Sequence, residues 1–179
     1  YKAAEKMPVV IILDNIRSLN NIGSVFRTAD AFRVEKICLC GITGQPPHRE
    51  IQKTALGATE SVDWEYFEHS VDAVVKIKNA GYRIIAVEQM ANSTQLHQFH
   101  HQKNKKIALI FGNEVNGVSV RIAIIFQELT IVFCDVLVIG IHADCLFQIF
   151  HNSIVIACSC ANNCLQIINF CGFLSTIQC

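Results

Sequence analysis

The sequence has no lysine or arginine after Arg121 and no proline after Pro47. All 15 basic residues lie in the first 121 residues, which hold 12 acidic ones and so carry a net charge of +3. The last 58 residues carry −3 and seven of the nine cysteines. The overall net charge of zero is therefore an average of two unlike parts, and each part is analysed separately.

Long apolar runs and targeting segments are also absent. The sequence is 51% hydrophobic, but polar residues such as Glu128, Asp135 and Asp144 interrupt every stretch before 18 apolar residues accumulate. This spacing argues against a membrane-spanning helix. The first residues contain no apolar signal segment behind a basic end. We therefore expect a cytoplasmic protein with no membrane partner, whose cysteines stay reduced.

The cysteines lack the CxxC pairs that zinc sites usually present. Cys38 and Cys40 form one CxC pair, Cys158 and Cys160 form another, and Cys164 follows. An extended strand puts both thiols of a CxC pair on one face, so a metal or redox site is one interpretation. Apolar packing is the other and the favoured one, because free cysteine is among the most buried residue types.

Short apolar runs alternate with amphipathic stretches through the first 111 residues. The apolar runs, rich in β-branched residues, predict buried strands at 8–13, 36–42, 62–67, 82–87 and 106–111. Helical spacing predicts helices at 22–33, capped by Asn21, at 50–56, and at 70–79, capped by Ser70. This order predicts an α/β fold, with a mostly parallel sheet and helices on both of its faces. Residues 95–106, with His97, His100 and His101, are expected to be an exposed connection rather than a metal site.

Ligands in such a sheet bind beyond the carboxyl ends of the strands, so the loops after residues 13, 42, 87 and 111 are candidate sites. In the first, Asn21 and Gly23 are expected to open a helix that carries Arg27 one turn further on. A helix N-terminus with an arginine suits a phosphate or a sugar hydroxyl. A surface arginine that pairs with Asp14 or Asp30 explains the same residues equally well.

The loop after residue 111 has the sequence Gly112-Asn113-Glu114-Val115-Asn116-Gly117-Val118-Ser119. Two glycines that flank an acidic residue allow a tight turn and a close approach to a ligand. Alternatively, Gly117 and Ser119 only cap the next helix. The loop has neither GxGxxG nor the lysine of a phosphate-binding loop, which argues against a nucleoside triphosphate site.

Together the two loops resemble the SpoU (TrmH-like) branch of the SPOUT RNA 2′-O-ribose methyltransferases. Asn21-Ile22-Gly23 and Arg27-Thr28-Ala29 match the first motif of that family, and residues 112–119 match the second. Between them, Lys53-Thr54-Ala55-Leu56-Gly57-Ala58 is similar to a Gly-Ala segment of the family. The resemblance covers about residues 8–120.

The resemblance implies methyl transfer from S-adenosylmethionine to a ribose 2′-hydroxyl of tRNA or rRNA. It also implies a SPOUT-type fold with a trefoil knot, a homodimer, and no metal. The catalytic residues would be Arg27, which polarises the hydroxyl, Asn21, which positions it, and Glu114. Residues lining the cofactor would be Val87, Glu88, Gly112, Asn113 and Gly117. RNA contacts would come from Arg17, Arg27 and Lys53, because basic side chains bind phosphates.

The third motif of the family, a strand ending in Ile-Pro and a later Ser-Leu-Asn, has no counterpart after Val120. We therefore divide the chain into a methyltransferase part, 1–120, and an atypical apolar, cysteine-rich tail, 121–179. The tail is expected to be the product of a shifted reading frame or a joined segment; the rival is a divergent segment that packs as apolar strands. The rival functions are an inactive RNA-binding relative, a defective product without the cofactor pocket, and a metal or redox protein that uses Cys158, Cys160 and Cys164.

Overall fold

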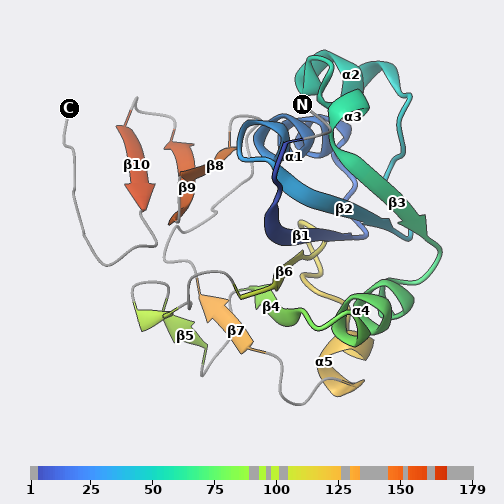
Figure 1. The fold of residues 1–179 in the computed structure, drawn as a ribbon, viewed down its shortest axis with the longest axis vertical. Coiled ribbons are helices and arrows are strands. Elements are labelled where there is room, and N and C mark those ends of the chain that lie inside the picture. The colour runs from blue at the N-terminus through green and yellow to red at the C-terminus, as the bar shows by residue number, and fades with distance from the viewer. Residues whose placement is uncertain are drawn as a thin grey trace.

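The computed structural model describes residues 4–88, 93–95, 98–100, 105–125, 130–133, 145–150, 153–160 and 164–168 of the chain. Strands and helices alternate through its first part (Figure 1). The strands are β1 (Met7–Asp14), β2 (Val34–Cys40), β3 (Asp63–Phe67), β4 (Arg83–Val87), β5 (Thr94–Gln95), β6 (Ile107–Phe111), β7 (Thr130–Phe133), β8 (Cys145–Phe150), β9 (Ser153–Cys160) and β10 (Cys164–Ile168). The helices are α1 (Leu19–Ala31), α2 (Arg49–Ala55), α3 (Ala58–Ser61), α4 (Ser70–Asn79) and α5 (Val120–Ile125).

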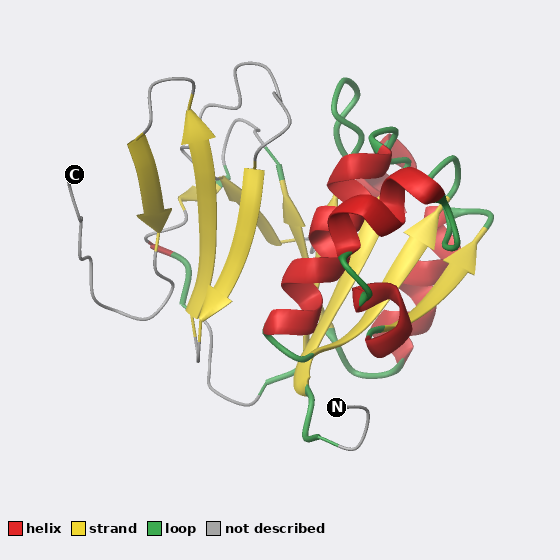
Figure 2. Cartoon of the chain, turned by 90° about the horizontal axis from the view of Figure 1, so that it is seen from above, coloured by secondary structure: helices red, strands yellow, loops and turns green. Residues whose placement is uncertain are grey.

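Seven strands form one sheet in the order β3-β2-β1-β6-β4-β7-β5, and their described pairings are all parallel. Near its centre, Ile11 of β1 lies opposite Ile37 of β2 on one side and Leu109 of β6 on the other. Parallel neighbours need crossover connections, and the helices supply them. The predicted parallel α/β fold is confirmed. β8, β9 and β10 form a second, antiparallel sheet (Figure 2).

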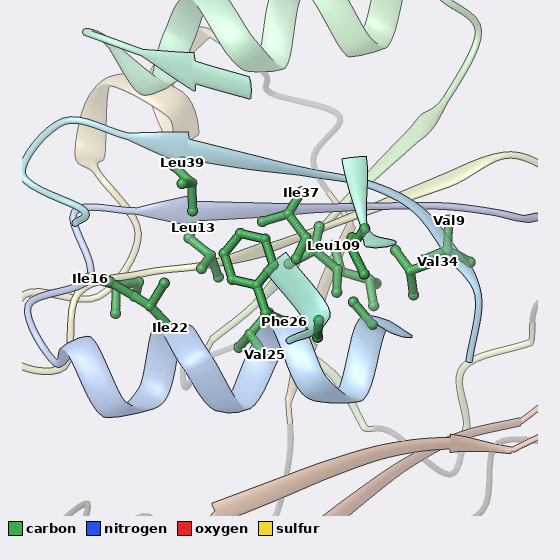
Figure 3. Close-up of a cluster of buried hydrophobic side chains, with 14 of the residues drawn as sticks. Val9, Leu13, Ile16, Ile22, Val25, Phe26, Val34, Ile37, Leu39 and Leu109 are labelled. Carbon is green, nitrogen blue, oxygen red and sulfur yellow. The ribbon is translucent and has the colours of Figure 1, made fainter. Parts of the chain in front are cut away.

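The central strand β1 is apolar on both faces, which explains its continuous apolar sequence. Val9, Ile11 and Leu13 pack in one core cluster with α1 and α2, where Phe26 of α1 lies between this helix and the sheet (Figure 3). Val10 and Ile12 belong to a second cluster that includes α4 and α5. The predicted helices therefore cover both faces of the sheet.

Cys38 and Cys40 are fully buried and point into the second cluster. Burial raises the pKa of the Cys38 thiol to about 12, and it raises that of Cys40 as well. These two thiols are apolar packing groups, as favoured above. Within the part of the chain that the structure describes, no three His, Cys, Asp or Glu side chains gather as metal ligands. The side chains of Cys158, Cys160 and Cys164 lie outside the described residues.

Two predicted helix caps are wrong. α1 begins at Leu19, three residues earlier than expected, because Ser18 is its cap and accepts a hydrogen bond from the Asn21 backbone N–H at 3.3 Å. Asn21 therefore lies inside the first turn. Ser70 is the first residue of α4 rather than its cap, and its hydroxyl donates to the Asp14 carboxylate instead.

The expected exposed connection at 95–106 is partly wrong. His100 is exposed, but Phe99 is buried in the first core cluster, and β5 pairs with β7. His97 and His101 lie outside the described residues. Among the helices described, none is long and apolar enough to cross a membrane. The trefoil knot concerns the chain after Ile125, parts of which lie outside the described residues, so it stays a prediction.

Candidate functional site

The two motif loops meet at the carboxyl edge of the sheet, where β1 and β6 are neighbours. The Glu114 carboxylate accepts hydrogen bonds from the backbone N–H groups of Arg17 and Ser18, both at 3.2 Å. The Asn113 side chain adds a bond from Nδ2 to the Asn15 carbonyl at 2.8 Å. Segments almost a hundred residues apart in the sequence are therefore joined directly at the edge where ligands bind in such sheets.

The second-motif loop, residues 112–119, is held by its own hydrogen bonds. Asn113 and Gly117 exchange two backbone bonds of 2.9 Å, and Asn113 Oδ1 accepts from the N–H groups of Val115 and Asn116. Gly117 has a φ of +67°, and a Cβ there would overlap the Glu88 carboxylate. A Cβ on Gly112 would overlap the backbone of Gly117 and Val118. Both glycines are therefore required by close packing within this loop.

The predicted cofactor-lining residues come together around this loop. Val87 lies opposite Phe111 in the register of β4 and β6, so both strands end at the same level. The next residue, Glu88, accepts a hydrogen bond from the Val118 N–H through Oε2 at 2.8 Å. Val87 and Glu88 are half-buried, Asn113 is buried, and the two glycines lie between them. The arrangement places apolar strand ends and the Glu88 carboxylate beside the second-motif loop.

At the start of α1, where a phosphate site is predicted, a carboxylate of the same chain lies against the backbone. The N–H groups that precede this helix are those of Arg17 and Ser18, and both donate to Glu114. A helix N-terminus favours negative charge, and here a carboxylate of the same chain supplies it. Glu114 therefore orders the first-motif loop, and the suggested phosphate or sugar site at the first turn of α1 stays a prediction.

Gly23 lies within α1 rather than at its start, and it faces α2. A Cβ on Gly23 would overlap Thr54 Oγ1 and the Ile51 carbonyl oxygen, so only glycine allows the two helices to approach this closely. Thr54 Oγ1 also donates to the Asn20 carbonyl at 3.1 Å. The first motif therefore packs against α2, which contains the first residues of the Lys53–Ala58 segment.

Arg27 is exposed on α1, and among the described residues its guanidinium has no hydrogen-bond or ion-pair partner. Neither suggested acidic partner is used. Asp14 is buried and bonded to Ser119 and Ser70, and Asp30 accepts from the Ser61 hydroxyl at 2.6 Å. The alternative of a paired surface arginine is therefore wrong.

Asn21 and Arg27 are not brought together by the helix. They are six residues apart, which puts them on different sides of α1. Asn21 is half-buried, whereas Arg27 shares the outer side with Asn20 and Ser24. Arg17 and Lys53 are exposed, the first in the loop before α1 and the second on α2 beside it.

Three residues that hold this edge were missed by sequence reasoning. Asp14 and Asn15 end β1, and Asn15 adopts a φ of +59° while its Oδ1 accepts from the Ile42 N–H at 3.2 Å. Thr43, from the loop after β2, donates to the Leu13 carbonyl and accepts from the Ile16 N–H. The available signal was the position of Asp14 and Asn15 directly after an apolar strand.

The structure is that of a parallel α/β protein whose two motif loops are joined at the carboxyl edge of the sheet. The profile of the SpoU rRNA methylase family matches residues 8–132. This match covers most of the chain, so the protein belongs to the SpoU rRNA methylase family. The match includes both motif loops, α5 and most of β7.

Several known proteins are similar to this chain. A Staphylococcus saprophyticus protein assigned to the TrmH family of tRNA/rRNA methyltransferases is 26% identical, over 66% of this chain and 46% of its own length. The 23S rRNA (guanosine-2′-O-)-methyltransferase RlmB of Neisseria meningitidis is 28% identical, over 73% of this chain and 48% of its own. The crystal structure of an AdoMet-bound rRNA methyltransferase from Sinorhizobium meliloti matches 72% of this chain and 48% of its own, with 25% identity and a TM-score of 0.63. The chain thus spans about half the length of the relatives it matches.

Proposed function

We propose that this protein transfers a methyl group from S-adenosylmethionine to a ribose 2′-hydroxyl of tRNA or rRNA. The observation that carries the proposal is the union of the two family motifs through Glu114, with the exposed Arg27 guanidinium left without a partner among the described residues. A relative named as a 2′-O-methyltransferase and a similar structure named as AdoMet-bound support the reaction and the cofactor.

The residues at the ends of β4 and β6 fit the chemistry of S-adenosylmethionine. Val87 and Phe111 offer half-buried apolar surface for an adenine ring, and the Glu88 carboxylate suits ribose hydroxyls or the cationic sulfonium. Gly112, Asn113 and Gly117 would line the cofactor. When bound, the cofactor would supply an electrophilic methyl group on its sulfonium sulfur.

Arg27 would act on the nucleophile. A guanidinium keeps its proton at neutral pH, so it is suited to donating hydrogen bonds rather than to removing a proton. Donation to the ribose 2′ oxygen stabilises the negative charge that develops there as its proton leaves. Asn21 would position the hydroxyl. Glu114 would contribute by holding the backbone that leads into α1, because its carboxylate is committed to two N–H groups.

Arg17 and Lys53 would bind RNA phosphates on the side of α1 and α2. Both side chains are exposed, and they belong to the part of the sequence with a net positive charge.

We propose a cytoplasmic homodimer. The exposed side chains of Val115 and Val120, which are 78% and 69% accessible beside the second-motif loop, are apolar surface that a partner copy would cover.

We further propose that residues 121–179 are a distinct tail that replaces the third-motif region, and that residues 1–120 form the catalytic part. The rival function is an inactive RNA-binding relative, favoured by the absence of the third motif from the sequence. Sequencing the coding DNA around codon 120 tests the origin of the tail. A one- or two-base shift that restores Ile-Pro and Ser-Leu-Asn supports a frameshift, and an intact frame without them contradicts it.

Calorimetric titration and a radiolabelled methyl-transfer assay test the function. We expect the folded full chain to bind S-adenosylmethionine and to transfer the labelled methyl group to tRNA or rRNA. The matched control is the same RNA sequence made with 2′-deoxyribose, which should accept no label. Binding of RNA without binding of the cofactor would contradict catalysis and favour the inactive relative. Label in the deoxyribose control would show that the acceptor is not the 2′-hydroxyl.

A further inference from the structure

Asp14 is the most deeply buried acidic group at the carboxyl edge of the sheet. It is the last residue of β1 and is 0% exposed. Its Oδ2 accepts a hydrogen bond from the Ser119 backbone N–H at 2.7 Å. Its Oδ1 accepts from the Asn15 side chain at 2.7 Å and from the Ser70 hydroxyl. A buried carboxylate is costly unless hydrogen-bonded, and here both oxygens have donors.

These bonds reach three separate segments. Ser119 ends the second-motif loop, Ser70 begins α4, and Asn15 opens the loop that leads to the first motif. Asn15 extends the network, because its Oδ1 accepts from Ile42 and its carbonyl accepts from Asn113. Asp14 thus lies where the connections after β1, β2, β3 and β6 converge.

The second-motif loop is therefore held by acidic side chains from two strands. Glu88, which follows β4, accepts a hydrogen bond from the Val118 N–H, and Asp14 accepts one from the Ser119 N–H. In the other direction, Glu114 of the loop takes the N–H groups of Arg17 and Ser18. Asp14, which precedes the first-motif loop, binds the second-motif loop, and Glu114 of the second-motif loop binds the first-motif loop. The relative position of the two motifs therefore depends on both acidic side chains.

We propose that Asp14 is a positioning residue for methyl transfer. It sets the place of the second-motif loop against the first-motif loop and so shapes the cofactor side of the site. The effect of Asp14 on catalysis rests on the proposed function. Its effect on the position of the second-motif loop does not. It predicts that loss of the Asp14 acceptor loosens residues 112–119 and weakens cofactor binding more than RNA binding.

Amide hydrogen exchange on the full chain tests the structural part without any ligand. We expect D14A to accelerate exchange of the Ser119 amide at least about tenfold, because a buried charged hydrogen bond is lost. D14N keeps one acceptor oxygen and should give an intermediate rate. S70A is the matched control, because it removes a different partner of the same carboxylate and should leave the Ser119 amide near its wild-type rate. Equal exchange in D14A and the wild type would overturn the proposal.

Binding measurements test the functional part. In D14N we expect the Kd for S-adenosylmethionine to rise about tenfold and the Kd for tRNA to stay within about twofold. A merely structural role would weaken both in proportion to the folded fraction, and that parallel loss would contradict positioning. If the wild type binds no cofactor, the proposed function fails, and the exchange experiment still decides the role of Asp14. Should D14A not fold, D14N against S70A provides the same comparison.

Discussion

The second-motif loop and helix α1 lie at the same edge of the sheet but use their polar groups in opposite ways. In the loop, the Asn113 side chain and the backbone of Gly117 and Val118 are bonded within the loop, to Asn15 or to Glu88. On α1, the outer side carries Asn20, Ser24 and Arg27, and Arg27 has no partner among the described residues. The loop is framework, whereas α1 presents an exposed guanidinium, the proposed catalytic group. This division separates residues whose loss should damage the fold from residues whose loss should damage only the reaction.

The largest effect is expected from Arg27→Ala. Loss of a donor to the reacting oxygen should reduce methyl transfer by about 100- to 1,000-fold. Cofactor affinity and thermal stability should stay near the wild type, because the exposed side chain holds no other group. Initial rates and calorimetry measure both. Arg33→Ala removes the same charge at the far end of α1 and should retain activity. An active Arg27→Ala variant would show that α1 does not present the catalytic group.

Gly23→Ala should act on the framework. A methyl group here would gain roughly 0.5–1 kcal/mol of helix propensity. It would also overlap the Ile51 carbonyl, which cannot rotate away, so we expect a net loss of about 1–3 kcal/mol in the free energy of unfolding. Urea denaturation measures it. Ser24→Ala, on the exposed side of the same helix, should change stability by less than about 0.5 kcal/mol. Equal stability of the two variants would contradict the close packing of α1 on α2.

Glu114→Gln tests whether this acid belongs to the framework or to the chemistry. Glutamine retains one acceptor oxygen for the two N–H groups of Arg17 and Ser18, so we expect activity to fall only about tenfold. Its pH profile should keep the wild-type shape, because a positioning carboxylate exchanges no proton with the substrate. Steady-state rates between pH 6 and 9 measure this. A change in the shape of that profile would instead assign Glu114 to proton transfer.

Lys53→Ala should have the smallest effect. Removal of one phosphate contact should weaken RNA binding a few-fold and reduce the slope of log K against log salt by about 0.7–0.9. Binding titrations at several salt concentrations measure this slope. Lys78→Ala is the control, since Lys78 lies on α4, across the sheet from α1 and α2, and should leave the slope unchanged. An unchanged slope in Lys53→Ala would remove α2 from the RNA surface.

Sequence patterns predicted the strands well because burial on both faces leaves a continuous apolar run. β1 and β6 were expected within one or two residues of their observed bounds. The start of α1 was missed because the cap depends on the backbone of Ser18, whereas several nearby polar residues have similar cap propensity. Phe99 was missed because its burial comes from a core formed by distant strands and helices.

The sequence by itself determined the α/β class, the two motifs and the family, because periodicity and residue order are local properties. Only the tertiary structure decided what the motif residues do for one another. Gly23 lies in close contact with α2, and the Glu114 carboxylate accepts hydrogen bonds from the segment before α1. Asp14 joined loops that begin more than ninety residues apart. These contacts depend on which strands are neighbours, and the order β2-β1-β6-β4 is set by how the whole chain packs.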